Sequence, residues 1–251
     1  RWGSIQSNLL GTSVGMAGDV NLDGFMDVIS GGPSNGYWTN LGEVIVLSGR
    51  DGSLIHRVSG DGSTDLFGVA VDGVGDVDGD AYVDFVVGAM ADDNNGLKSG
   101  MVRVYSGRTG KVLYERDGDA SGDYLGVSVS GVGDVNQDGY DDFVAGASIN
   151  LSQGQKGYAR VYSGKDGSTL YTFRGDSNFD QLGGAVSGAG DVDNDGVPDI
   201  VVGIPKDDNT GSNSGSVRVY SGRTGAILYT LDGDSRGDEF GKSVSVAGDV
   251  D

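Results

Sequence analysis

A tripeptide, Gly-Asp-Val, recurs along the chain at an almost constant spacing. It begins at Gly18, Gly75, Gly133, Gly190 and Gly248, so the intervals are 57, 58, 57 and 58 residues. Repeats of this length are single supersecondary units that bury their apolar faces against their neighbours. The chain is therefore expected to fold as a row of equivalent units. We place them near residues 10–66, 67–124, 125–181 and 182–239, with a partial unit at 240–251.

Each repeat predicts four short strands and no helix. In the second repeat, apolar or alternating segments span residues 67–74, 82–89, 101–106 and 111–116, and turn-forming residues separate them. No segment combines helix caps with a 3.6-residue period. The 48 glycines among 251 residues fit many tight turns between short strands.

Four short antiparallel strands per repeat are typical of a β-propeller blade, in which stacking buries both faces of each sheet. We predict an all-β fold, a β-propeller with four-stranded antiparallel blades, comprising four full repeats and part of a fifth. A β-solenoid is the alternative, although its coils are usually shorter than these repeats. The partial repeat favours a piece of a larger propeller over a ring that two chains complete together.

The formal net charge of −20 limits the partners of the chain. A polyanion of this kind repels nucleic-acid phosphates and anionic lipid surfaces, so we expect no nucleic-acid partner and no membrane insertion. The chain has no cysteine and one histidine, His56, so thiolate and multi-histidine metal sites are excluded. The negative charge is expected either to stay solvated or to hold cations.

An Asp-rich loop follows each of the first four Gly-Asp-Val tripeptides. We number each loop from its first aspartate, and the candidate ligands occupy positions 1, 3, 5, 7 and 9. They are Asp19, Asn21, Asp23, Phe25 and Asp27 in the first loop; Asp76, Asp78, Asp80, Tyr82 and Asp84 in the second; Asp134, Asn136, Asp138, Tyr140 and Asp142 in the third; and Asp191, Asp193, Asp195, Val197 and Asp199 in the fourth. Position 7 is expected to offer only its main-chain carbonyl oxygen.

This pattern predicts about four Ca²⁺ ions, one in each complete loop. Ca²⁺ takes six to eight oxygen ligands in flexible geometry, whereas Mg²⁺ demands a near-ideal octahedron and keeps several waters. Asp-rich turns do form without metal. Here, however, several carboxylates would crowd each bend and repel one another without a cation. Glycine at position 6 permits the sharp turn in three loops, and Ala81 in the second loop predicts a strained turn or a weaker site.

Two further motifs flank the loops and carry a family resemblance. Phe67-Gly68 and Phe240-Gly241 precede a loop, and Gly88-Ala89-Met90 and Gly31-Gly32-Pro33 follow one. The pattern resembles the FG-GAP repeats of integrin α-subunit propellers and their bacterial relatives. The resemblance implies structural Ca²⁺ on the face opposite the usual ligand surface, and an extracellular or cell-surface role in adhesion or recognition. Cysteines typical of animal integrins are missing, which favours a bacterial or distant protein.

The connections between second and third strands vary most among the repeats, and such loops commonly carry binding residues. Tyr37 and Trp38 lie in the first of them and are candidate partner contacts, although they could instead cover a neighbouring blade. Arg103, Arg160 and Arg218 recur in the third strand and are expected to pair with blade carboxylates or to form a solvated stripe.

The function predicted from the sequence is a calcium-binding, non-enzymatic propeller module for extracellular or cell-surface recognition, with an unidentified protein or glycan ligand. No polar cluster outside the repeats suggests catalysis. Two alternatives stay open. The chain could be a non-catalytic domain of a secreted enzyme, or an extracellular structural protein that self-associates through open blade edges.

Overall fold

The computed structural model describes residues 9–33, 40–148 and 156–248, which form four antiparallel sheets of four strands each and no helix. Each sheet uses four consecutive strands in chain order, so each repeat forms one blade. The all-β fold and its four-stranded blades are thus as predicted from the repeats.

The strands of the first two blades have the following bounds. Blade 1 contains β1 (Ser13–Gly18), β2 (Asp27–Gly32), β3 (Glu43–Leu47) and β4 (Leu54–Ser59). Blade 2 contains β5 (Phe67–Gly75), β6 (Asp84–Ala89), β7 (Met101–Tyr105) and β8 (Val112–Asp117). The second strand of blade 2 therefore begins at Asp84 and not at residue 82 as predicted, because Tyr82 and Val83 belong to the Asp-rich loop.

The other two blades repeat the pattern. Blade 3 contains β9 (Leu125–Gly133), β10 (Asp142–Ala147), β11 (Tyr158–Tyr162) and β12 (Thr169–Arg174). Blade 4 contains β13 (Ala185–Gly190), β14 (Asp199–Ile204), β15 (Ser216–Tyr220) and β16 (Ile227–Asp232). After blade 4, Phe240 forms a parallel bridge with Gly215, as Leu125 does with Gly100 at the junction of blades 2 and 3.

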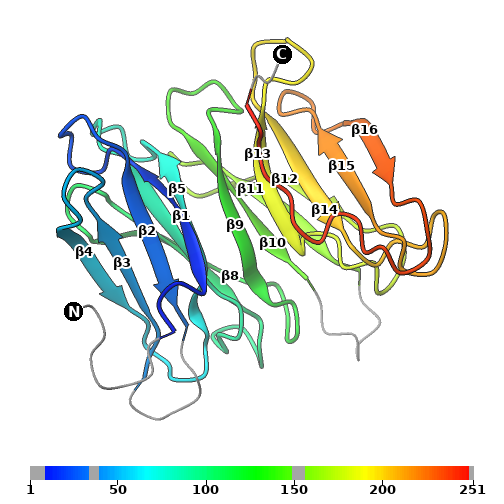
Figure 1. The fold of residues 1–251 in the computed structure, drawn as a ribbon, viewed down its shortest axis with the longest axis horizontal. Coiled ribbons are helices and arrows are strands. Elements are labelled where there is room, and N and C mark those ends of the chain that lie inside the picture. The colour runs from blue at the N-terminus through cyan, green and yellow to red at the C-terminus, as the bar shows by residue number, and fades with distance from the viewer. Residues whose placement is uncertain (1–8, 34–39, 149–155, 249–251) are drawn as a thin grey trace.

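The blades lie side by side in chain order, with their first strands next to one another (Figure 1). Strands β1, β5, β9 and β13 line a cavity of about 550 Å³, to which residues 244–246 also contribute. The second and third strands are largely buried, whereas the fourth strands are mostly exposed. This arrangement is that of propeller blades around an axis, with the first strands innermost.

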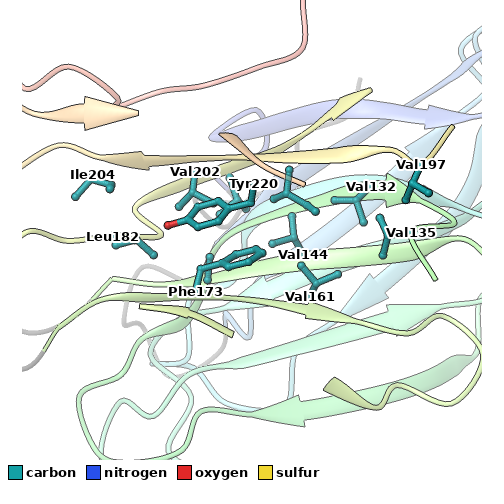
Figure 2. Close-up of a cluster of buried hydrophobic side chains, with 13 residues drawn as sticks. Val132, Val135, Val144, Val161, Phe173, Leu182, Val197, Val202, Ile204 and Tyr220 are labelled. Atoms are coloured by element: carbon teal, nitrogen blue, oxygen red, sulfur yellow. The ribbon is translucent and has the colours of Figure 1, made fainter. Parts of the chain in front are cut away.

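The hydrophobic core is divided among the junctions between blades. The described residues form three clusters of buried side chains, and each cluster combines residues of two successive blades. At the junction of blades 3 and 4, Val144, Val161 and Phe173 pack against Val202 and Tyr220 (Figure 2). A blade therefore buries its apolar faces mainly against its neighbours, as expected for a repeat that cannot form a core by itself.

The glycines of the two flanking motifs allow adjacent blades to touch through their backbones. A Cβ atom added at Gly88 would lie 2.0 Å from the carbonyl oxygen of Gly126, and one added at Gly146 would lie 1.9 Å from that of Gly183. Side chains do not fit at such distances. The contact recurs between Gly203 and Gly241, where the distance is 1.9 Å, so residues 240–241 already pack on blade 4 as a further repeat would.

Arginines of the third strands join each blade to the one before it. Arg160 of β11 pairs with Asp119, which follows β8, with 2.7 Å between Nη2 and Oδ2. Arg103 pairs in the same way with Asp61 at 3.1 Å, and Arg218 pairs with Asp176. The arginines are therefore structural partners of carboxylates, which was one of the two expectations from the sequence.

Candidate metal centre

The four Asp-rich loops join the first strand of a blade to its second strand. Two residues in each loop adopt left-handed backbone conformations, at positions 4 and 6. At position 6 the φ angles are 87° at Gly24, 89° at Gly139 and 85° at Gly196, but 72° at Ala81. A left-handed conformation costs a residue with a Cβ atom roughly 1–2 kcal/mol. The second loop is thus strained at Ala81, as the sequence predicted.

Hydrogen bonds within each loop turn the oxygen-bearing side chains inward. In the third loop, Asp134 Oδ1 accepts a bond from the Asp138 N–H at 3.0 Å, and Asp134 Oδ2 accepts one from the Gly139 N–H at 2.8 Å. Asn136 Oδ1 also accepts a bond from the Asp138 N–H, and Asp138 Oδ1 accepts one from the Tyr140 N–H. Equivalent bonds occur in the other three loops.

The aspartate at position 9 attaches the loop to the turn that follows the third strand of its own blade. Asp27, Asp84, Asp142 and Asp199 all have 0 % exposure. In blade 3, Asp142 Oδ2 accepts a bond from the Val135 N–H at 3.0 Å, and Oδ1 accepts one from the Gly164 N–H at 2.9 Å. Burial raises the pKa of Asp84 to about 7 and the pKa of Asp142 to about 6. A nearby cation would offset this cost of burying negative charge.

In the second loop and in the fourth loop, the carboxylates of the same loop lie close enough together to bind one ion. Ligand atoms of Asp76, Asp78 and Asp84 lie within 4.8 Å of one another, and the same holds for Asp191, Asp193 and Asp199. The first and third loops have asparagine at position 3, where the amide oxygen can replace a carboxylate oxygen as a calcium ligand. Each oxygen has two lone pairs, so bonds to backbone N–H groups leave capacity for a cation. The donor sets therefore fit a hard cation.

A basic residue near position 5 or 7 of each loop was not anticipated from the sequence. Arg223 Nε donates a hydrogen bond to Asp195 Oδ2 at 2.8 Å. The guanidinium of Arg108 lies 5.3 Å from the centre of the Tyr82 ring, and the Lys165 amine lies 5.3 Å from that of the Tyr140 ring. The signal was present, because Arg50 and these three residues each follow a Ser-Gly pair at the end of the third strand.

A third acidic group lies away from these loops and consists of Asp61, Asp65 and Asp92. Asp61 is already paired with Arg103, and Asp92 Oδ1 accepts a hydrogen bond from the Asn94 N–H at 2.8 Å. Equivalents of Asp65 close turns, since Asp123 Oδ2 accepts a bond from Ala120. We therefore interpret this group as structural.

Some of the sequence predictions fall outside the part of the chain that the structure describes. These are the candidate partner contacts Tyr37 and Trp38 and the start of the fifth loop at Asp249. The carbonyl oxygens proposed at Phe25, Tyr82, Tyr140 and Val197 stay predictions. The side-chain ligands at positions 1, 3, 5 and 9 lie in the four loops as described above, although their role as ligands also stays a prediction.

Comparison with known proteins agrees with this geometry. The family model described as "FG-GAP repeat" matches residues 125–162 and 183–220, which span the first three strands and the Asp-rich loops of blades 3 and 4. The chain therefore contains FG-GAP repeats in blades 3 and 4. Its sheets are the blades of a β-propeller of the integrin α type, and the resemblance noted in the sequence is confirmed.

Curated relatives carry the integrin alpha name. The chain is 30% identical to integrin alpha-6 of Gallus gallus over 234 residues, which cover 86% of this chain and 20% of that protein. It is 27% identical to integrin alpha-5 of Xenopus laevis over 223 residues, covering 80% and 21% of the two chains. For integrin alpha-V of Gallus gallus the identity is 29% over 218 residues, covering 78% and 20%. The chain thus spans about a fifth of the length of these relatives.

Within the described residues there is no long apolar helix of the kind that crosses a lipid bilayer.

Proposed function

We propose that this FG-GAP propeller segment is a calcium-binding, non-enzymatic module for recognition or adhesion outside the cell or at its surface. The observation that carries the calcium part is the convergence of carboxylates in repeated loops, with three ligand atoms within 4.8 Å of one another in blades 2 and 4. The relatives named as integrin alpha subunits support the recognition part. The ligand would be a protein or a glycan.

The role of calcium in this proposal is structural. The position 1 ligand follows the first strand, and the position 9 ligand begins the second strand. The position 9 carboxylate also accepts a hydrogen bond from the turn after the third strand, at Gly49, Gly107, Gly164 or Gly222. An ion among these groups would connect three strands of one blade. Four Ca²⁺ ions would also supply eight positive charges against the net charge of −20. Calcium would therefore stabilise the folded chain by binding it in preference to the unfolded chain.

Thermal unfolding in calcium and in the chelator EGTA tests the calcium part. We expect the melting temperature to fall sharply in EGTA and to recover when calcium is restored. Asp134→Asn should reduce the difference between the two conditions, because it removes a carboxylate from the third loop. Asp234→Asn is the matched control, since it makes the same change at an exposed aspartate outside the loops. Identical melting curves of the unmodified chain in calcium and EGTA would refute a calcium-stabilised fold.

Recognition is tested with arrays of glycans and extracellular matrix proteins probed in calcium. We expect saturable binding to at least one class of ligand, and loss of that binding in EGTA at a temperature where the blades unfold. Binding that persists while the chain is unfolded would show that the propeller surface is not the recognition element.

A further inference from the structure

The aspartate at position 8 of the third loop reaches into the second loop, across the junction between blades 2 and 3. Asp141 Oδ2 accepts a hydrogen bond from the Asp76 N–H at 3.0 Å. In return, the Asp141 N–H donates to the Asp76 carbonyl oxygen at 3.1 Å. Asp141 thus holds both polar groups of the Asp76 backbone, although 65 residues separate the two in sequence.

The contact is close and depends on the local sequence. A Cβ atom added at Gly75 would lie 2.0 Å from Asp141 Oδ2, so only glycine leaves room for this carboxylate beside the second loop. The neighbouring Tyr140 ring packs against the same loop, with its Cε1 atom 2.8 Å from the Cβ position of Gly79. The third loop therefore contacts the second loop at its first and fourth positions.

Asp76 is the residue around which the second loop is organised. Its Oδ1 accepts hydrogen bonds from the N–H groups of Gly79 and Asp80, and its Oδ2 accepts one from Ala81. Since Ala81 is strained at φ 72°, the second loop gains most from an outside contact that fixes its backbone. A preorganised loop loses less conformational entropy when it binds an ion.

At the other two junctions, position 8 makes no polar link among the described residues, and the hydrogen bond that joins the third and fourth loops runs instead from Gln137 Nε2 to the Gly196 carbonyl oxygen at 3.4 Å. Position 8 of the second loop is Val83, whose methyl carbon Cγ1 lies 2.6 Å from the Cβ position of Gly18. Position 8 of the fourth loop is Pro198, which lacks an N–H group and meets Gly133 through its ring carbon Cγ at 3.1 Å. Both contacts are apolar, so position 8 makes no hydrogen bond there to the backbone of the first residue of the preceding loop.

We infer that Asp141 is a positioning residue that couples calcium binding in the second and third loops, so that an ion in the third loop raises the affinity of the second. Asp141 lies between Tyr140 and Asp142, two proposed ligands of the third loop. An ion held by that loop fixes Asp141 from both sides, and Asp141 in turn fixes Asp76. By linkage, the effect is reciprocal. The inference rests on the proposed calcium binding and adds a specific dependence between two of its sites.

The charge of Asp141 acts in the same direction. Two bound Ca²⁺ ions repel each other, which by itself would make neighbouring sites compete. A carboxylate between the two loops offsets part of that repulsion. The hydrogen bond and the charge are separable, because asparagine at position 141 keeps an oxygen acceptor and loses the charge.

The test measures the metal affinity of the second loop by itself, within the full chain. Terbium can replace calcium, and its emission is sensitised by a nearby tyrosine; the second loop has Tyr82, whereas the first and fourth have Phe25 and Val197. Tyr140→Phe removes the tyrosine of the third loop and keeps the ring against Gly79. In the Tyr140→Phe chain, terbium is titrated and then displaced with calcium. The affinity of the second loop is compared between a chain whose third loop is intact and a chain whose third loop is disabled by Asp134→Ala.

With Asp141 present, we expect disabling the third loop to weaken binding at the second loop at least about fivefold, the lower end of typical allosteric coupling. Asp141→Val, which copies Val83, should weaken the second loop to a similar extent and make it insensitive to Asp134→Ala. Asp141→Asn should retain part of the coupling through its amide oxygen. Disabling the first loop with Asp19→Ala is the matched control and should change the second loop less than twofold, because Val83 makes only apolar contact.

Equal affinity of the second loop with the third loop intact or disabled would overturn the inference, and so would coupling that survives Asp141→Val. Hydrogen exchange of residues 75–81 provides a second readout. In chains that retain Asp141, the exchange should slow when calcium binds the third loop. In chains that lack Asp141, calcium in the third loop should leave the exchange of these residues unchanged. If the unmodified chain binds neither terbium nor calcium, the proposed calcium binding itself fails. If the chain binds calcium but its sites are independent of one another, only the inference about Asp141 fails.

Discussion

Blades 3 and 4 present equivalent residues on the side that faces the next repeat, but only the face of blade 3 is covered by a complete described blade. Phe173 of blade 3 is 6 % exposed and stacks on Tyr220 of blade 4, with ring centroids 3.9 Å apart. Leu231, at the equivalent place in blade 4, is 55 % exposed. The same sheet face is therefore a core in one position and a surface in another.

The Asp-rich loops show the same contrast. Position 2 of the loop is Val135 in blade 3, where it is 3 % exposed and belongs to the junction core. The equivalent Val192 of blade 4 is 39 % exposed. Position 2 lies between two proposed metal ligands, so a covered loop is held by the neighbouring blade as well as by its own strands. The comparison indicates that the stacking of blades and the conformational ordering of the Asp-rich loops depend on each other.

Shortening a side chain on the face of blade 3 that packs against blade 4 should have the largest effect on the free energy of unfolding. Phe173→Ala removes a buried ring that contacts blade 4, and such substitutions cost about 3–5 kcal/mol of unfolding free energy. Leu231→Ala at the equivalent exposed place should cost less than about 0.5 kcal/mol. Chemical denaturation of both variants in calcium measures the difference. Equal losses would mean that residues 240–248 cover blade 4 as well as a complete blade covers blade 3.

The loop valines should show a smaller difference of the same sign. Val135→Ala deletes buried methyl groups, worth about 2 kcal/mol, whereas Val192→Ala should cost well under about 1 kcal/mol. Because Val135 anchors the third loop, its variant should also bind calcium more weakly in a calorimetric titration. If Val135→Ala lowers stability and leaves calcium affinity intact, the junction does not help to order the loop.

The ion pairs between blades should give the smallest effect. The Arg160 guanidinium lowers the pKa of Asp119, and this carboxylate is half exposed, so Asp119→Asn should cost roughly 0.5 kcal/mol. Asp234, the equivalent residue after blade 4, is exposed and forms no ion pair within the described part of the chain, so Asp234→Asn should be neutral.

The pH dependence of this pair follows from the sign of the shift. A folded-state pKa below the unfolded value means that the contribution of Asp119 is present above about pH 4, the usual aspartate range, and is lost as the pH falls further. The difference in stability between the Asp119→Asn variant and the unmodified chain should therefore shrink at pH 3. A difference that stays constant from pH 7 to pH 3 would exclude an electrostatic origin.

Much of the fold could be predicted because the same sequence pattern occurs in four successive repeats. The period located the blades, and strand-forming segments between glycines located most strands. The start of the second strand was placed too early, because Tyr82 and Val83 are apolar and strand-like but lie in a loop held by Asp76 and Asp84. Sequence alone gives local preference there, and the hydrogen bonds of the loop override it.

The parts of the site that escaped prediction all depend on neighbours in space. Arg108 lies over Tyr82, and Asp141 holds Asp76, across distances in sequence of 26 and 65 residues. A single sequence shows that these residues recur or differ among repeats but not which residue each one contacts. The close approach of Gly88 to Gly126 likewise explains the family motif only once adjacent blades are seen together.

The role of the Asp-rich loops is tested most directly by anomalous diffraction from crystals of the chain grown in millimolar calcium. We expect one peak in each of the four complete loops, with oxygen atoms of positions 1, 3, 5, 7 and 9 at about 2.3–2.6 Å from it. Well-ordered loops without any peak, held only by the hydrogen bonds described above, would contradict calcium binding at these sites.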